Sequence, residues 1–149
     1  DVVKTPLAST EGTVIEAAVP LLAVPMLPGG LQLWEGAREV LPNADLCLGG
    51  LPGTIEVQAG VVLLLDQVRH GDELIGLLQS LEQLGVDAPR LRVITCLTSS
   101  PGLKRIGESY PEITIHTACI DAELDDQQRI LPGIGDPLQR LGIRTAQAT

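Results

Sequence analysis

The chain has 149 residues, of which 44% are hydrophobic, and a formal net charge of −9 at pH 7. This length suits one domain with a normal core, and the apolar content argues against intrinsic disorder. The negative charge and an aromatic fraction of 1% argue against nucleic acid as a partner, because binding it requires basic surfaces and aromatic platforms. No apolar run approaches the roughly 18 residues that a membrane span requires.

The first part of the sequence alternates short strands with one helix. Segments rich in β-branched and aliphatic residues, which favour strands, lie at 2–7, 13–18, 19–26 and 44–49. The sequence STEG at 9–12 predicts a turn between the first two. Apolar residues recur at helical spacing over 30–41, so we expect a helix there. A connector rich in glycine and proline, with one weak strand at 54–58, covers residues 49–60.

A strand-helix-strand unit forms the centre of the sequence. The run VVLLLD at 61–66 is apolar without alternation, as in a central parallel strand covered on both faces. Leucines on one stripe predict a helix over about 72–84, and the next strand spans 92–99. A helix over 101–110 and a strand over 113–121 continue the pattern. This order predicts an α/β fold, an open, mainly parallel twisted sheet with helices on both faces and ligands bound at the carboxyl ends of the strands.

Three cysteines, Cys47, Cys96 and Cys119, each lie within an apolar segment. An odd number of buried thiols is typical of a reducing compartment and not of a disulfide framework. We therefore expect an intracellular protein of the cytoplasm or an organelle interior. No zinc-type spacing of Cys and His occurs, so we expect no metal site from these residues. His116 is the one histidine on an expected strand. A single histidine on a strand is more often a hydrogen-bonded or exposed side chain than a catalytic group.

The loop that follows Asp66 leads into the N-terminus of a helix, which is the natural place for a bound phosphate. Phosphate loops use glycines and hydroxyls, so that backbone N–H groups can close on the anion. This loop, DQVRHGDEL, has one glycine, Gly71, and no Ser or Thr. The carboxylates at 72–73 favour the helix dipole but repel an anion. We expect a capped helix here, with Arg69 and His70 as the groups that could still bind something acidic.

Two further features follow the last expected strand. Four carboxylates cluster between Asp121 and Asp126. They suit a solvated loop, and the alternative is a metal ion held on a substrate's diphosphate. The stretch RILPGIGD at 129–136 contains a tight Pro-Gly turn. Its exposed backbone groups could hydrogen-bond the edge of a flat heterocycle.

The C-terminal part carries a family resemblance. The stretch VITCLTSSPGLKRIGESYPEITIHTACIDAELDDQQRILPGIGDPLQRLGI at 93–143 resembles the C-terminal third of a uracil phosphoribosyltransferase, including the TACID segment and the PGIGD turn. Weaker similarity covers AVPMLPGGL at 23–31 and the strand and helix at 61–86. The resemblance implies a type I phosphoribosyltransferase-like fold in a single domain over 1–149, without the family's preceding N-terminal helices. It also implies conversion of uracil and phosphoribosyl diphosphate into UMP with Mg²⁺, in a dimer or higher oligomer.

The resemblance also suggests roles for particular residues. A base-binding group would comprise Ile130, Gly135, Asp136 and Pro137, with Asp136 also facing the phosphoribosyl group. A remnant of the phosphoribosyl loop would comprise Asp66, Arg69, His70 and Gly71. The family's Thr-Gly-Gly-Ser/Thr turn is replaced by RHGDE, one residue shorter, and Pro28 stands where the family carries an arginine that meets the diphosphate. A short connector at 45–60 replaces a longer segment that carries a second arginine.

These departures affect the half of the site that handles the diphosphate. Positive charge and oriented N–H groups stabilise such a leaving group, so we expect no confident catalytic residue and a loss of phosphoribosyl transfer. The main expectation is a non-catalytic subunit or scaffold in a homo- or hetero-oligomer, with an active paralogue or larger complex as partner. A sensor of uracil or UMP stays open as an alternative. An active transferase that uses Arg69 or a partner's residues with Mg²⁺ also stays open.

Overall fold

The computed structural model describes residues 1–12, 16 and 18–146. Its centre is a five-stranded sheet in which every neighbouring pair is parallel, in the order β4-β3-β5-β6-β7. The strands are β3 (Leu21–Pro25), β4 (Ala44–Leu46), β5 (Gly60–Val68), β6 (Leu91–Ser99) and β7 (Thr114–Asp121). This architecture confirms the predicted α/β fold.

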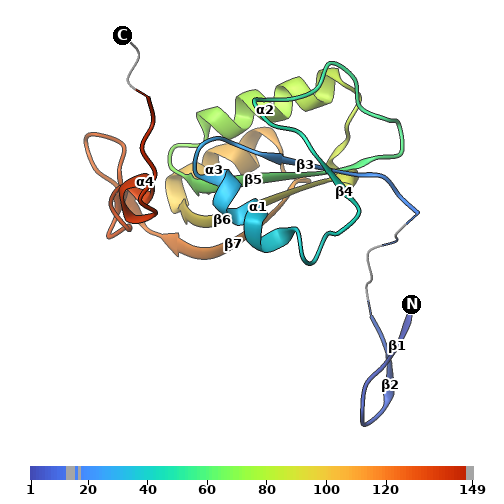
Figure 1. The fold of residues 1–149 in the computed structure, drawn as a ribbon. Coiled ribbons are helices and arrows are strands. Elements are labelled where there is room, and N and C mark those ends of the chain that lie inside the picture. Colours follow the sequence, from blue (N-terminus) through green and yellow to red (C-terminus); the bar gives the residue numbers. More distant parts are fainter. Residues whose placement is uncertain (13–15, 17, 147–149) are drawn as a thin grey trace.

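Helices cover both faces of the sheet (Figure 1). They are α1 (Gly30–Ala37) on one face, and α2 (Asp72–Gln83) and α3 (Ser100–Ser109) on the other. The central strand β5 explains this arrangement, because its side chains alternate between two cores. Val61, Leu63 and Leu65 join the core under α2 and α3, whereas Val62 and Leu64 join the core under α1. A strand buried on both faces needs an unbroken apolar run.

The segment that follows β7 folds beside the carboxyl ends of the strands (Figure 1). It forms a hairpin of two short strands and then one turn of helix, namely β8 (Glu123–Leu124), β9 (Ile130–Leu131) and α4 (Pro137–Arg140). At the other edge, a 3₁₀ turn, η1 (Ala88–Arg90), connects α2 to β6. The segment after β7 places the PGIGD turn near the end of β5 and the loop that follows it, because residues of both line one cleft.

The N-terminal hairpin differs from the sequence prediction. Strand β1 (Val2–Lys4) pairs antiparallel with β2 (Ser9–Glu11), so the turn predicted at 9–12 is wrong. The turn lies instead at residues 5–8, where the backbone N–H and the hydroxyl of Thr5 both donate to the carbonyl of Ala8 at 2.8 Å. The strand predicted at 13–18 falls mostly outside the described residues.

The connector before β5 contains no strand, so the strand predicted at 54–58 is wrong. Arg90 holds the end of this connector by hydrogen bonds. Its guanidinium donates to the carbonyl of Glu56 at 2.9 Å and to that of Ala59 at 2.8 and 3.0 Å. A side chain thus satisfies backbone groups that a sheet ladder would otherwise pair.

Two cysteines predicted to be buried are exposed, so this prediction is wrong. Cys96 and Cys119 are exposed, and Cys47 is half-buried. The reason is tertiary, because α1 packs on β3 and β5 and leaves this face of β6 open at Cys96. Cys119 lies on the edge strand β7. Within the part of the sequence that the structure describes, no helix is long and apolar enough to cross a membrane.

Candidate functional site

A cleft of about 490 Å³ lies at the carboxyl edge of the sheet, as expected for a parallel α/β fold. The loop after β3 forms one wall and the end of β5 another, and the segment from Arg129 to Leu138 closes the third side. The cleft brings together six of the eight candidate residues, namely Asp66, Arg69, Ile130, Gly135, Asp136 and Pro137. The other two, His70 and Gly71, line a smaller hollow of about 80 Å³, which shares Arg69 and Glu73 with the cleft.

The PGIGD turn (132–136), for which the resemblance suggested base binding, is held by hydrogen bonds to Asp121 and Arg140. The N–H of Gly133 donates to the Asp121 carboxylate at 2.8 Å, and Arg140 Nε donates to the carbonyl of Ile134. Gly133 has a φ of +61°, and a side chain there would collide with the carbonyl of Ile130. A glycine is therefore needed at this point, and the turn presents a fixed backbone edge to the cleft.

Two of the base-binding candidates also stabilise the fold, one by packing in the interior and one by capping a helix. Ile130 is 6% exposed and anchors strand β9 in the protein interior. Asp136 is the N-cap of α4, and its carboxylate accepts the N–H of Leu138 at 2.9 Å. Such capping fixes the direction of the carboxylate. The cleft floor is therefore organised before any ligand enters.

Asp66 is half-buried, directly follows the buried run 61–65 of β5, and faces the glycine turn after β3. Its carboxylate accepts the N–H of Gln67 at 2.8 Å. Gly29 packs directly against this carboxylate, with no room for a Cβ atom. Pro28, half-buried, lies in the same wall of the cleft and brings no charge to it.

The N-terminus of α2 is occupied by a side group of its own first turn. Asp72 forms an ion pair with Arg105 of α3 at 2.5 Å, and its carboxylate lies 3.1 Å from His70 Nδ1. The backbone N–H of Asp72 also donates to His70 Nδ1, at 3.2 Å. The positive end of a helix and its free N–H groups are what bind a phosphate. Here the Asp72 carboxylate already lies at this positive end, and the imidazole of His70 accepts the N–H of Asp72.

Residues of α3 fix the loop from the other side. The Ser99 hydroxyl donates to the carbonyl of Arg69 and accepts the N–H of Gly102 at 2.9 Å as the N-cap of α3. Gly102 lies so close to the Arg69 carbonyl that there is no room for a Cβ atom. No sequence pattern predicted these contacts or the ion pair of Arg105 with Asp72. One local signal could have indicated the cap, namely Ser99 placed before a helix that has proline in its first turn.

The charges in the cleft nearly cancel. Three carboxylates, from Asp66, Glu73 and Asp136, line it together with the guanidinium groups of Arg69 and Arg129. Arg129 is paired with Asp125 at 2.7 Å, whereas Arg69 forms no ion pair with any residue that the structure describes. A diphosphate would meet one unpaired cation and several carboxylates.

The acidic cluster that follows β7 is divided between two sets of hydrogen bonds. Asp121 holds Gly133, as described above, and Asp125 accepts the backbone N–H of Arg129 at 2.8 Å and that of Gln127 at 2.9 Å. Among the described residues, no three His, Cys, Asp or Glu side chains are grouped closely enough to hold a metal ion. These two carboxylates stabilise the loop and its hairpin.

The Asp125 carboxylate should titrate at an unusually low pH. The backbone N–H of Arg129 is the main cause that lowers its pKa below the ordinary 3.8, and the guanidinium of Arg129 lowers it further. Because the folded-state pKa is depressed, its contribution to the hairpin is present above the ordinary pKa and lost as pH falls through the lowered value. A carbon-detected NMR titration should give a midpoint below 3.8. Arg129→Ala should raise that midpoint in part, because the backbone donor remains; an unperturbed midpoint in the unmodified protein would contradict the assignment.

Comparison with known proteins shows which family has this fold and cleft. The sequence model of the family described as uracil phosphoribosyltransferase matches residues 1–141. Proteins named uracil phosphoribosyltransferase from Synechococcus elongatus and from a Nostoc species are 35% and 32% identical, and each alignment covers 93% of this chain and 71% or 72% of the relative.

A solved structure, that of the AQ2163 protein from Aquifex aeolicus, superposes with a TM-score of 0.72 at 26% identity. The match covers 95% of this chain and 73% of that protein. The family model spans both the loop after β5 and the PGIGD turn, the two segments that meet in the cleft. The protein therefore belongs to the uracil phosphoribosyltransferase family.

Proposed function

We propose that this member of the family has lost phosphoribosyl transfer and serves as a non-catalytic subunit or scaffold. The observation that carries the proposal is the occupied N-terminus of α2. There the Asp72 carboxylate is paired with Arg105, and the backbone N–H of Asp72 donates to His70 Nδ1. A phosphate arriving at this point would have to displace a negatively charged group that already has its partners, and would be repelled by it.

The electrostatics of the cleft support the same conclusion. Departure of a diphosphate from the ribose depends on oriented donors and positive charge around the leaving group, and removing one such donor costs about 2.7–4 kcal/mol of transition-state stabilisation. In this cleft Pro28 contributes no charge, and Glu73 adds a negative one. Arg69 is the unpaired cation among the lining residues that the structure describes. The missing stabilisation therefore amounts to several such contributions.

The base end of the cleft supports a related possibility, a sensor of uracil or a uridine nucleotide. The turn is held by the hydrogen bonds of Gly133 and Asp136, and its residues Gly135 and Asp136 line a cleft of about 490 Å³. That volume lies within the roughly 300–1,000 Å³ of small-molecule sites. Binding of a base there would need no phosphate loop.

The second candidate function is the transferase activity itself, making UMP from uracil and phosphoribosyl diphosphate. The names of the curated relatives favour it, as does the unpaired Arg69 in the cleft. Carboxylate oxygens such as those of Asp66 and Asp136 are ligands that Mg²⁺ prefers. No three of them are grouped for a metal within the described residues, so Mg²⁺ would be held largely by the diphosphate.

Two measurements on one preparation separate these functions. The first is UMP formation from uracil, phosphoribosyl diphosphate and Mg²⁺ at high enzyme concentration, with the Synechococcus elongatus relative as positive control. The second is calorimetric titration with UMP in the presence of Mg²⁺. We expect no UMP formation and no heat at millimolar UMP, because both the anion site and its charge are missing. Formation of UMP that Arg69→Ala abolishes would refute the proposal and establish the transferase.

Binding of UMP without turnover would instead establish the sensor. Gly135→Val tests whether the PGIGD turn is responsible, because Gly135 has a φ of +73° that valine adopts with strain. Gly49→Val is the matched control, since Gly49 has a φ of +83° and lies in the connector outside the cleft. A scaffold role also requires an assembly, so a protein that sediments as a monomer and captures no partner would contradict it.

A further inference from the structure

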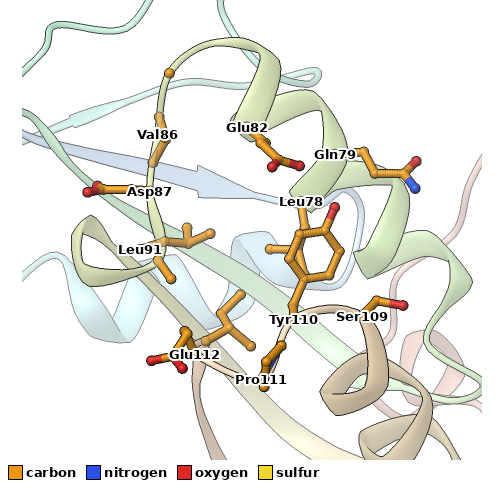
Figure 2. A pocket seen from close by; sticks show the side chains of 13 residues that line it. Leu78, Gln79, Glu82, Val86, Asp87, Leu91, Ser109, Tyr110, Pro111 and Glu112 are labelled. Atoms are coloured by element: carbon orange, nitrogen blue, oxygen red, sulfur yellow. The ribbon is translucent and has the colours of Figure 1, made fainter.

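A second cavity lies at the opposite edge of the sheet from the cleft, where the amino ends of β6 and β7 meet the last turns of α2 and α3. Its volume is about 610 Å³. The segment from Gly85 to Leu91 forms one wall, and residues 109–113 form the other (Figure 2). None of its lining residues belongs to the cleft, so this cavity is separate from the site described above.

The floor of this cavity is apolar. Leu78, Val86 and Leu91 are buried beneath it. The ring of Tyr110, half-buried, stands beside Leu78 (Figure 2). An aliphatic or aromatic group placed here would bury its surface against these side chains, at a gain of roughly 25 cal/mol per Å².

Both helices that border the cavity end in it. Helix α2 ends at Gln83 and α3 at Ser109, and neither has a basic residue in its last turn. A helix C-terminus carries about half a negative charge, which a lysine or arginine often neutralises. After α2, the guanidinium of Arg90 takes part of this role, because it donates to the carbonyl of Gly85 at 3.0 Å. For α3, no basic side chain donates to a carbonyl of its last turn among the described residues, so the end of α3 favours a cation.

Carboxylates add to this potential. Glu82 lies on the side of α2 that faces Tyr110, and Glu112 lies on the opposite rim (Figure 2). Neither forms an ion pair with the residues that the structure describes, whereas Asp87 lies 3.9 Å from Arg90. Burial, and then the charge of Glu82, raise the pKa of the Tyr110 hydroxyl. That effect is consistent with a negative potential at the mouth of the cavity.

We propose that this cavity binds a small organic cation, an amine or guanidinium carried on an aliphatic or aromatic body. The apolar floor takes the body, and the end of α3 together with Glu82 and Glu112 takes the charge. The face of Tyr110 offers a further attraction for a cation. A volume of about 610 Å³ matches a small molecule better than a partner helix, which would need a groove along an element. The inference does not rest on the proposed function.

The test uses two probes with the same indole body and opposite charge, tryptamine and indole-3-propionate. Titration of the ¹⁵N-labelled protein should show saturable shifts for tryptamine in the millimolar range, at the amides of 85–91 and 109–113. Indole-3-propionate should produce no saturable shift there. The double variant Glu82→Gln/Glu112→Gln should bind tryptamine about three- to tenfold more weakly, as expected for two partly exposed charge contacts.

The matched control is Glu35→Gln/Glu39→Gln, which removes two exposed carboxylates on and after α1. Tryptamine affinity should be unchanged in this variant. Three results would overturn the proposal. They are shifts that lie outside the cavity, equal binding of the two probes, and equal weakening in both double variants. Perturbation of the same amides by a basic peptide but not by tryptamine would also overturn it, in favour of a protein partner.

Discussion

Gly102→Ala is expected to destabilise the protein by about 1–3 kcal/mol, the usual cost of forcing an extra group into a packed site. A Cβ atom at this position of α3 would collide with the carbonyl of Arg69 and would lie 3.0 Å from Ser99 Oγ. Either α3 must shift or the loop of residues 69–71 must move. Both responses break the hydrogen bond from the Ser99 hydroxyl to Arg69.

Gly107→Ala in the same helix is the matched control, because no atom lies within 4 Å of the Cβ that it would add. An exposed helical glycine replaced by alanine should stabilise the protein by about 0.5–1 kcal/mol. Urea unfolding of both variants measures the two free energies of unfolding. We expect Gly102→Ala to lower the free energy of unfolding and Gly107→Ala to raise it. Equal changes in the two variants would show that Gly102 does not contact the loop.

Leu63→Ala is expected to lower the free energy of unfolding by about 3–5 kcal/mol. Leu63 lies on the central strand β5 and is fully buried, with the equally buried Val24 and Val93 beside it on the neighbouring strands. The substitution removes apolar surface and leaves a cavity that flanking strands cannot collapse to fill. Leu7→Ala is the control, since Leu7 is 97% exposed and should change stability by less than about 0.5 kcal/mol. A small effect at Leu63 would mean that the core repacks.

The contacts of Asp72 connect the fold to the proposed function. Ser99, at the end of β6, bonds Arg69 in the loop between β5 and α2. Arg105, within α3, pairs with Asp72 at the start of α2. The loop is thus fixed by a neighbouring element and by its own first helical turn. A phosphate-binding loop must leave its N–H groups free for the anion, and the N–H of Asp72 is already bonded to His70.

The part of the fold that depends on local pattern could be predicted from the sequence. The apolar run of β5 and the leucine stripe of α2 indicated a parallel sheet covered on both faces, because side-chain periodicity determines which faces of an element are buried. The same pattern placed the candidate site at the carboxyl ends of the strands. The family resemblance assigned Asp66 and the PGIGD turn to one site, and Asp66, Gly135 and Asp136 line the same cleft.

Contacts between residues far apart in the sequence were decided by the tertiary structure alone. Cys96 looked buried by its neighbours, but no helix covers that part of β6. The connector at 49–60 forms no strand, and the guanidinium of Arg90 instead donates to its carbonyls at Glu56 and Ala59. The ion pair of Asp72 with Arg105, and the cavity where α2 and α3 both end, likewise depend on how two helices pack. Periodicity determines which side of an element is buried, whereas the packing of elements determines which polar groups meet and where space remains.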